Sequence, residues 1–283
     1  MHPLFGPRER VKRANHQIVT LQRSFGGFFK DNLYEIALAE LNPTANDYSL
    51  RVKSGPQEFP DYWPPVIGEI AHNLRAALDG LAWQLALLKP TTPYDRTAFP
   101  IYLLGKTTRK RRGTLLPHFW GRGHGLRLIQ SIPEPLWARI ESFQPYKRGN
   151  GGRHSPLFLL EKMNNTDKHR LLTVLVVSPA SIEFRGASGG TKLKLGVPLR
   201  PNAKVGSVRD VPPPTEGGGA VLVFNPATGE LEHPKMEVNV TVEPGVRFGD
   251  GCEAVERLPV IRTLRRMADE VSQVVESFSD EFS

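Results

Sequence analysis

The sequence predicts an α+β fold in which a helical core is joined to an antiparallel β segment. Three observations predict this class. Both chain ends carry apolar residues at helical spacing, a longer stripe of the same kind lies at residues 64–88, and the pattern changes to period two at about residues 179–248. We therefore expect a helical domain with a β-hairpin at residues 1–178, an antiparallel β segment at 179–250, and a C-terminal helix at 251–283 that packs back on the helical domain.

Two amphipathic helices are predicted at the chain ends. Apolar residues near the N-terminus are spaced alternately three and four apart, as on the seam of a coiled coil, and they are Val11, Ala14, Ile18, Leu21, Phe25 and Phe28. The far end has the same spacing, in Val260, Leu264, Met267, Val271, Val274 and Phe278. We expect the two stripes to pack together and to close one fold across the whole chain. The alternative is that these seams join copies of the chain into a homo-oligomer.

The predicted β elements are short alternating runs separated by turns. Near the N-terminus, LYEIALAEL and DYSLRVKS flank the turn signal NPTAND, which indicates a hairpin. In the later segment the alternating runs are SIEF, KLKLGV, AVLVF and MEVNVTV. They are separated by the hairpin turn NPATGE and the breaker-rich loop PPPTEGGGA, which favours an antiparallel arrangement.

The central helices are predicted from one apolar stripe and one capping signal. The stripe of residues 64–88 falls on one face at about 100° per residue and comprises Ile67, Ile70, Ala71, Leu74, Leu78, Leu81, Leu85 and Leu88. A further helix should begin after Ser155, an N-cap followed by Pro156, and it could run as far as Val177. Shorter helices fit LRLIQS and PLWARIESF.

Composition excludes several classes of protein. No apolar run approaches the roughly 18 residues that a membrane helix needs, and the N-terminus lacks the apolar core of a signal peptide. Cys252 is the only cysteine, which excludes an internal disulfide and a CxxC metal site. The sequence contains neither a GxxxxGK[ST] phosphate loop nor a GxSxG elbow, which disfavours nucleotide hydrolysis and acyl transfer. We expect a cytoplasmic protein with no membrane contact, no cofactor and no metal.

Positive charge is concentrated in one part of the chain. The net charge is +8, whereas residues 105–153 hold eleven basic and two acidic side chains, a local charge of +9. The candidate nucleic-acid-binding residues there are Arg109, Lys110, Arg111, Arg112 and Arg122, beside His118, Phe119, Trp120 and His124. Basic side chains interleaved with aromatic rings suit a nucleic acid or another anionic ligand. We call residues 105–127 the basic segment; the alternative is that it is a solvated loop with no partner.

A first polar motif lies beside the apolar stripe in HNLRAALDGLAWQL. His72, Arg75, Asp79 and Trp83 share one side of the predicted helix. Arg75 and Asp79 are four residues apart and can pair along the helix. This motif is either a half-buried ion pair that sets the packing of the helix or part of a functional site.

A second polar motif is MNNTDKHRLL. If its helix is continuous, Asp167 lies among apolar neighbours at helical spacing, which are Leu160, Met163, Leu171 and Val174. A carboxylate in that position needs a cation, and we expect Arg75 to be its partner. Alternatively, Asn165 or Thr166 caps a new helix that begins near Asp167.

Together the two motifs could support metal-free phosphodiester transfer. His72 or His169 would move protons, and Arg75 or Arg170 would stabilise charge on phosphorus. The candidate catalytic residues are His72, Arg75, Asp79, Asp167, His169 and Arg170. The alternative is a non-enzymatic binding or oligomerising scaffold module whose polar motifs are structural.

Four segments, in order, resemble the landmarks of an uncharacterised family of bacterial, mainly actinobacterial, proteins. They span about residues 30–177 and read IGEIAHNLRAALDGLAWQL, TAFPIY, FQPY and MNNTDKHRLL. The first landmark of that family also resembles the Arg-x4-His signature of HEPN-type ribonucleases, which implies RNA as a substrate or partner. In this chain Gly80 stands where that signature has its final His. HEPN-like chemistry would therefore need His72 or His169 in its place, and otherwise the chain is inactive.

Overall fold

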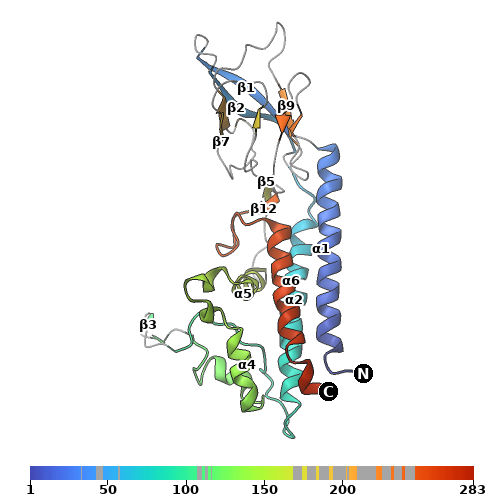
Figure 1. Cartoon of the computed structure of the whole chain (residues 1–283), viewed down its shortest axis with the longest axis vertical. Coiled ribbons are helices and arrows are strands. Elements are labelled where there is room, and N and C mark those ends of the chain that lie inside the picture. Colours follow the sequence, from blue (N-terminus) through green and yellow to red (C-terminus); the bar gives the residue numbers. More distant parts are fainter. Residues whose placement is uncertain are drawn as a thin grey trace.

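A computed structural model of the chain describes the following residues: 1–32, 34–42, 47–56, 58–106, 110–111, 114–115, 117–167, 174–176, 183–184, 191–193, 202, 204–208, 221–224, 231–232, 238–239 and 246–283. Helices dominate these residues, as the sequence predicts for the core. Three long helices lie side by side (Figure 1): α1 (Phe5–Asp31), α2 (Trp63–Ala86) and α6 (Val260–Glu276). A fourth, α5 (Pro156–Asp167), packs against α2 and α6.

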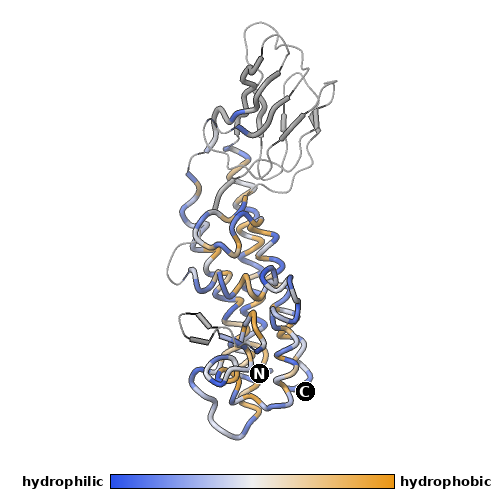
Figure 2. Tube along the Cα trace, turned by 90° about the vertical axis from the view of Figure 1, so that its left-hand side faces the viewer, coloured by the Kyte–Doolittle hydropathy of each residue, from blue (hydrophilic) through white to orange (hydrophobic). Residues whose placement is uncertain are grey.

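The terminal helices pack against each other, as their apolar spacing predicts. Ile18 of α1 and Leu264 of α6 are almost fully buried, and α1 contacts both α2 and α6. Phe29 is fully buried near the end of α1, whereas Phe28 is half-buried. Figure 2 shows apolar positions recurring along the helices of this bundle. The two seams are therefore occupied within one chain.

The stripe on α2 forms the centre of the core. Its residues from Ile67 to Leu85 are fully buried, whereas Leu88 lies beyond the end of the helix and is 41% exposed. Among the described residues no helix combines the length and the apolar composition needed to cross a membrane.

Helix α5 begins where the sequence predicts but ends earlier. Ser155 Oγ accepts a hydrogen bond from the Phe158 N–H at 3.3 Å, which caps the helix. The continuous helix expected as far as Val177 is wrong, because Val174–Val176 form strand β5 and pair antiparallel with β12 (Val246–Phe248). The alternative of a new helix capped by Asn165 or Thr166 is also wrong, since both residues lie inside α5.

Shorter helical elements pack along one side of the bundle. They are α3 (Gly125–Ile129), α4 (Trp137–Ser142) and the 3₁₀ elements Glu134–Leu136 and Pro145–His154, whereas the 3₁₀ element Ser279–Phe282 follows α6 at the C-terminus. In Figure 1 the segment that carries α4 lies on the opposite side of the bundle from α1. The helices expected at LRLIQS and PLWARIESF correspond to α3 and α4.

A sheet lies at one end of the bundle, and both chain termini lie at the other end (Figure 1). Strand β1 (Tyr34–Asn42) pairs antiparallel with β2 (Asp47–Ser54), with Leu38 opposite Leu50. The strand order is β10-β9-β1-β2-β8-β7. The outer strands are β7 (Thr191–Leu193), β8 (Lys204–Val208), β9 (Val221–Phe224) and β10 (Leu231–Glu232).

Strands from both halves of the chain therefore meet in this sheet. Two further pairs are antiparallel, β6 (Glu183–Phe184) with β11 (Val238–Asn239) and β3 (Lys110–Arg111) with β4 (Thr114–Leu115). The turn NPATGE, the loop PPPTEGGGA and residues 43–46 of the turn NPTAND lie outside the described residues. The domain boundaries near residues 178 and 250 stay a prediction.

Candidate functional site

Arg75 and Asp79 of α2 hold both polar backbone groups of Phe99. The two side chains form the predicted ion pair, with 2.9 Å between Arg75 Nη2 and Asp79 Oδ1. Arg75 Nη2 also donates to the Phe99 carbonyl at 2.7 Å, and Asp79 Oδ1 accepts from the Phe99 N–H at 3.0 Å. The pair thus attaches the extended segment TAFPIY to α2 and satisfies backbone groups that burial would otherwise leave unpaired.

The second carboxylate at Arg75 comes from Glu161 of α5. Glu161 Oε2 lies 3.4 Å from Arg75 Nη1, and only 13% of the Arg75 side chain is exposed. The predicted contact between Arg75 and Asp167 is therefore wrong, because Glu161 takes that place. Asp167 lies six residues further along, at the end of α5. One guanidinium is thus paired with two carboxylates.

Tyr102 and Gln144 complete the attachment of this segment. Gln144 is fully buried; its Oε1 accepts from the Tyr102 N–H at 3.0 Å, and its Nε2 donates to the Pro100 carbonyl at 2.7 Å. Burial raises the pKa of the Tyr102 hydroxyl, and the charge of Glu161 raises it further, against the opposing effect of Arg75. The landmarks TAFPIY and FQPY therefore meet at one place.

The chemistry open to this cluster is limited by its own contacts. Arg75 Nη2 is engaged by a carbonyl and a carboxylate, and Nη1 faces Glu161. A phosphate could reach this guanidinium only by displacing a carboxylate of like charge. The arrangement is that of a structural clamp between α2, α5 and the segment at Phe99.

His72 of α2 and Asp167 of α5 form a separate group, nearer the start of α2 than Arg75. The Asp167 carboxylate packs over Gly68, so closely that a Cβ at position 68 would overlap it. Burial raises the pKa of Asp167, and the nearby charge of His72 partly offsets this. His72 itself is exposed. The structure thus divides the predicted catalytic residues into two groups, and His169 and Arg170 lie outside the described residues.

The basic segment is described in part. Lys110 and Arg111 form β3, whereas Arg109 and Arg112 lie outside the described residues. Arg122 is exposed, and among the residues that the structure describes no hydrogen bond or ion pair involves its side chain. Arg127, by contrast, donates to the Tyr94 hydroxyl through Nε at 2.9 Å. Arg122 and Lys106, which is also exposed and has no interaction among the described residues, are therefore the cations of this segment that are open to a ligand.

Glu141 of α4 anchors the loop that carries Arg122. Its Oε1 accepts hydrogen bonds from Trp120 Nε1 at 3.0 Å and Tyr146 Oη at 2.6 Å, and it pairs with Lys147 at 2.9 Å. Burial alone would raise the pKa of Glu141, but the three donors together lower it below its usual range. Burial and the Glu141 carboxylate raise the pKa of Tyr146 in turn. Glu141 is therefore a charged anchor whose Oε1 already holds three donors.

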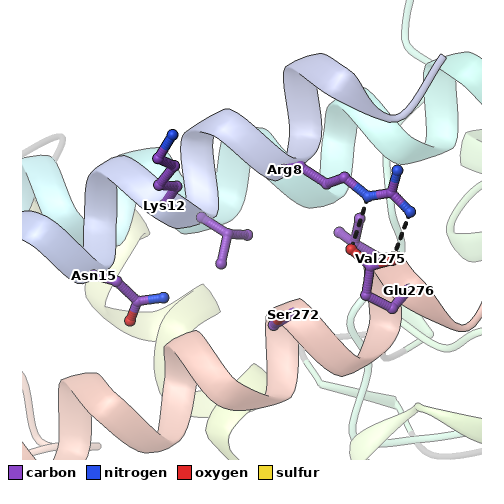
Figure 3. A pocket seen from close by; sticks show the side chains of 7 residues that line it. Arg8, Lys12, Asn15, Ser272, Val275 and Glu276 are labelled. Atoms are coloured by element: carbon purple, nitrogen blue, oxygen red, sulfur yellow. Dashed lines mark hydrogen bonds and ion pairs between the residues drawn. The ribbon is translucent and has the colours of Figure 1, made fainter. Parts of the chain in front are cut away.

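A pocket of about 290 Å³ lies between α1 and α6 (Figure 3). Arg8 points across it to Glu276, with Nε donating to Oε1 at 2.8 Å and Nη2 to Oε2 at 2.6 Å. Lys12, on the same wall, pairs with Glu9 at 3.4 Å. Both cations of the pocket are thus neutralised, and we assign no anion site to it.

Sequence reasoning missed three residues of the clamp, which are Tyr102, Gln144 and Glu161. The first two stand within quoted landmarks, so their position in TAFPIY and FQPY was a usable signal. The sequence signal for Glu161 is weaker: it follows four apolar residues in the same predicted helix. Within the described residues, no group of three or more His, Cys, Asp or Glu side chains is placed to hold a metal ion.

No family model matches the chain, and no curated protein or solved structure matches it. The resemblances to the bacterial family and to HEPN-type ribonucleases therefore stay predictions.

Proposed function

We propose that this protein binds RNA, or another phosphodiester polymer, through the basic segment at residues 105–127. The observation that carries the proposal is Arg122, which is exposed and has no partner among the described residues, in a segment with seven Arg and Lys side chains and no Asp or Glu. Trp120 supplies a ring on which a base can stack. Such a surface attracts a polyanion and pairs with its phosphates.

The clamp at Arg75 has a structural role in this proposal. A HEPN-like site on α2 and α5 would need Arg75 to hold a phosphate, and Arg75 is already held by Asp79, Glu161 and the Phe99 carbonyl. The clamp supports binding indirectly, since it positions the segment that leads into residues 105–127. An oligomerising scaffold is the second candidate, but its seams are buried between α1 and α6.

The proposal includes an α+β organisation for the whole chain and a cytoplasmic location, where RNA is available. The β segment of residues 179–250 would form an antiparallel sheet with the N-terminal hairpin. That sheet lies at the end of the bundle remote from the termini (Figure 1).

Salt-dependent binding tests the proposal. We expect fluorescence anisotropy with a labelled single-stranded RNA to give an affinity that falls steeply between about 50 and 200 mM salt, because bound phosphates release counterions. A variant with the basic segment neutralised should bind more weakly and with a flatter salt dependence. Its substitutions are Arg109→Ser, Lys110→Ser, Arg111→Ser and Arg112→Ser.

A matched control removes the same charge from α1, which lies on the other side of the molecule from β3 (Figure 1). Its substitutions are Arg10→Ser, Lys12→Ser, Arg13→Ser and Arg23→Ser. Equal losses in the two variants would indicate attraction by net charge alone and would contradict a site at residues 105–127. Tighter binding to polyglutamate than to RNA would favour an acidic protein partner instead.

A further inference from the structure

Two imidazole rings of the basic segment face one another across a glycine. The centroids of the His118 and His124 rings lie 5.6 Å apart, with 57° between their planes, and both residues are half-buried. A Cβ on Gly121 would lie 2.9 Å from His124 Cδ2 and 3.1 Å from His118 Cε1. Both rings thus pack closely against Gly121, a position at which a side chain would crowd them.

The backbone around the two rings is held in place. The Phe119 N–H donates to the Leu104 carbonyl at 2.8 Å, and the Trp120 N–H donates to the Gly105 carbonyl at 3.0 Å. The Phe119 side chain is fully buried, and Trp120 is tied to Glu141. The imidazoles are therefore carried by an anchored turn, as an acid–base pair requires.

The charge around the pair suits a phosphate. Arg122 directly follows Gly121 and is exposed without a partner in the described part of the chain. The nearby carboxylate of Glu141 is already used by three donors. A phosphodiester bound at Arg122 would therefore lie beside two imidazole rings.

We propose that His118 and His124 are the acid–base pair of a metal-independent ribonuclease site, with Arg122 as a ligand of the scissile phosphate. One imidazole accepts the proton of the ribose 2′-hydroxyl as its oxygen bonds to phosphorus. The other donates a proton to the 5′-oxygen as the phosphorus–oxygen bond breaks. The products are a 2′,3′-cyclic phosphate and a free 5′-hydroxyl. This inference rests on the proposed RNA binding, since it needs the chain to hold RNA at the same segment.

Cleavage and binding are measured separately on the full chain. With a labelled single-stranded RNA and EDTA present, we expect cleavage to a 2′,3′-cyclic phosphate. His118→Ala and His124→Ala should each lower the rate roughly 100-fold or more. Both should change the RNA dissociation constant less than twofold. His16→Ala, which removes an exposed histidine of α1, should cleave like the wild type. DNA of the same sequence should bind and stay intact, because it lacks the 2′-hydroxyl.

Every other outcome of these measurements contradicts one part of the proposal. Binding without cleavage would overturn the acid–base pair and leave the proposed function standing, whereas no binding at low salt would overturn both. Cleavage that needs an added divalent ion would overturn the metal-free step. If an alanine variant has a lower melting temperature than the wild type, His118→Asn or His124→Asn should preserve the fold and still lose cleavage. Retained cleavage in a folded variant would refute the assignment of the two histidines as the acid–base pair.

Discussion

Arg75 of α2 and Glu161 of α5 approach to 3.4 Å between Nη1 and Oε2, and this ion pair links two helices through residues that are 86 positions apart in the chain. Arg75 also pairs with Asp79 and with the Phe99 carbonyl, so one side chain connects α2, α5 and the extended segment at Phe99. The polar residues that suggested catalysis thus stabilise the packing of the core.

Replacing Arg75 should destabilise the fold. Arg75→Met leaves Glu161 and Asp79 with uncompensated charge, so we expect the free energy of unfolding to fall by roughly 2–3 kcal/mol, measured by urea denaturation. Adding Glu161→Leu should recover part of that loss. Arg13→Met removes an exposed cation that has no ion pair among the described residues, and it should change stability by less than about 0.5 kcal/mol. Equal effects of Arg75→Met and Arg13→Met would contradict the clamp.

Gly68→Ala should be destabilising, although alanine in a helix interior is normally better than glycine by about 1 kcal/mol. The reason is the overlap between a Cβ at position 68 and the Asp167 carboxylate. Gly26→Ala in α1, where nothing lies within 4 Å of the new Cβ, should instead be stabilising. Thermal melts of both variants measure this difference in sign.

The same overlap predicts a rescue. Asp167→Ala removes the carboxylate, so the double variant with Gly68→Ala should be more stable than Gly68→Ala alone. A double variant no better than the single one would show that Asp167 does not pack over Gly68.

Removing the Gln144 amide should loosen the segment that it holds. Gln144→Leu leaves the Tyr102 N–H and the Pro100 carbonyl without their partner, at a cost of roughly 2–3 kcal/mol. The Tyr102 amide should then exchange with deuterium faster than in the wild type. Gln130→Leu, at an exposed position at the end of α3, is the control and should leave that exchange unchanged.

Asp167 predicts a pH dependence of stability. Because burial raises its pKa in the folded chain, the folded state holds this proton more tightly than the unfolded state. The wild type therefore loses stability as pH rises from the ordinary carboxyl pKa of about 4 to the raised value, and loses no more above it.

Asp167→Asn lacks this titration. Its advantage over the wild type in the free energy of unfolding should grow through that pH interval and then stay constant. Urea unfolding of both proteins at a series of pH values measures the difference. An advantage independent of pH would contradict a buried carboxylate.

The local sequence pattern alone was enough to predict the long helices and one ion pair. The stripes of α1, α2 and α6 follow from apolar spacing, because a helix that repeats every 3.6 residues must bury whatever recurs at that period. The start of α5 follows from the Ser155 cap. The Arg75–Asp79 pair follows from their separation by one helical turn.

Contacts between segments that are distant in the chain decided the features that the local pattern did not predict. Helix α5 (Pro156–Asp167) does not continue to Val177, because Val174–Val176 pair with strand β12, about 70 residues further along the chain. Glu161 rather than Asp167 meets Arg75, because the end of α5 is occupied by the close approach to Gly68. His118 and His124 converge because their turn is bonded to Leu104 and Gly105. Helical periodicity is a property of neighbouring residues and can be predicted from sequence, whereas these pairings depend on where separate segments dock in space.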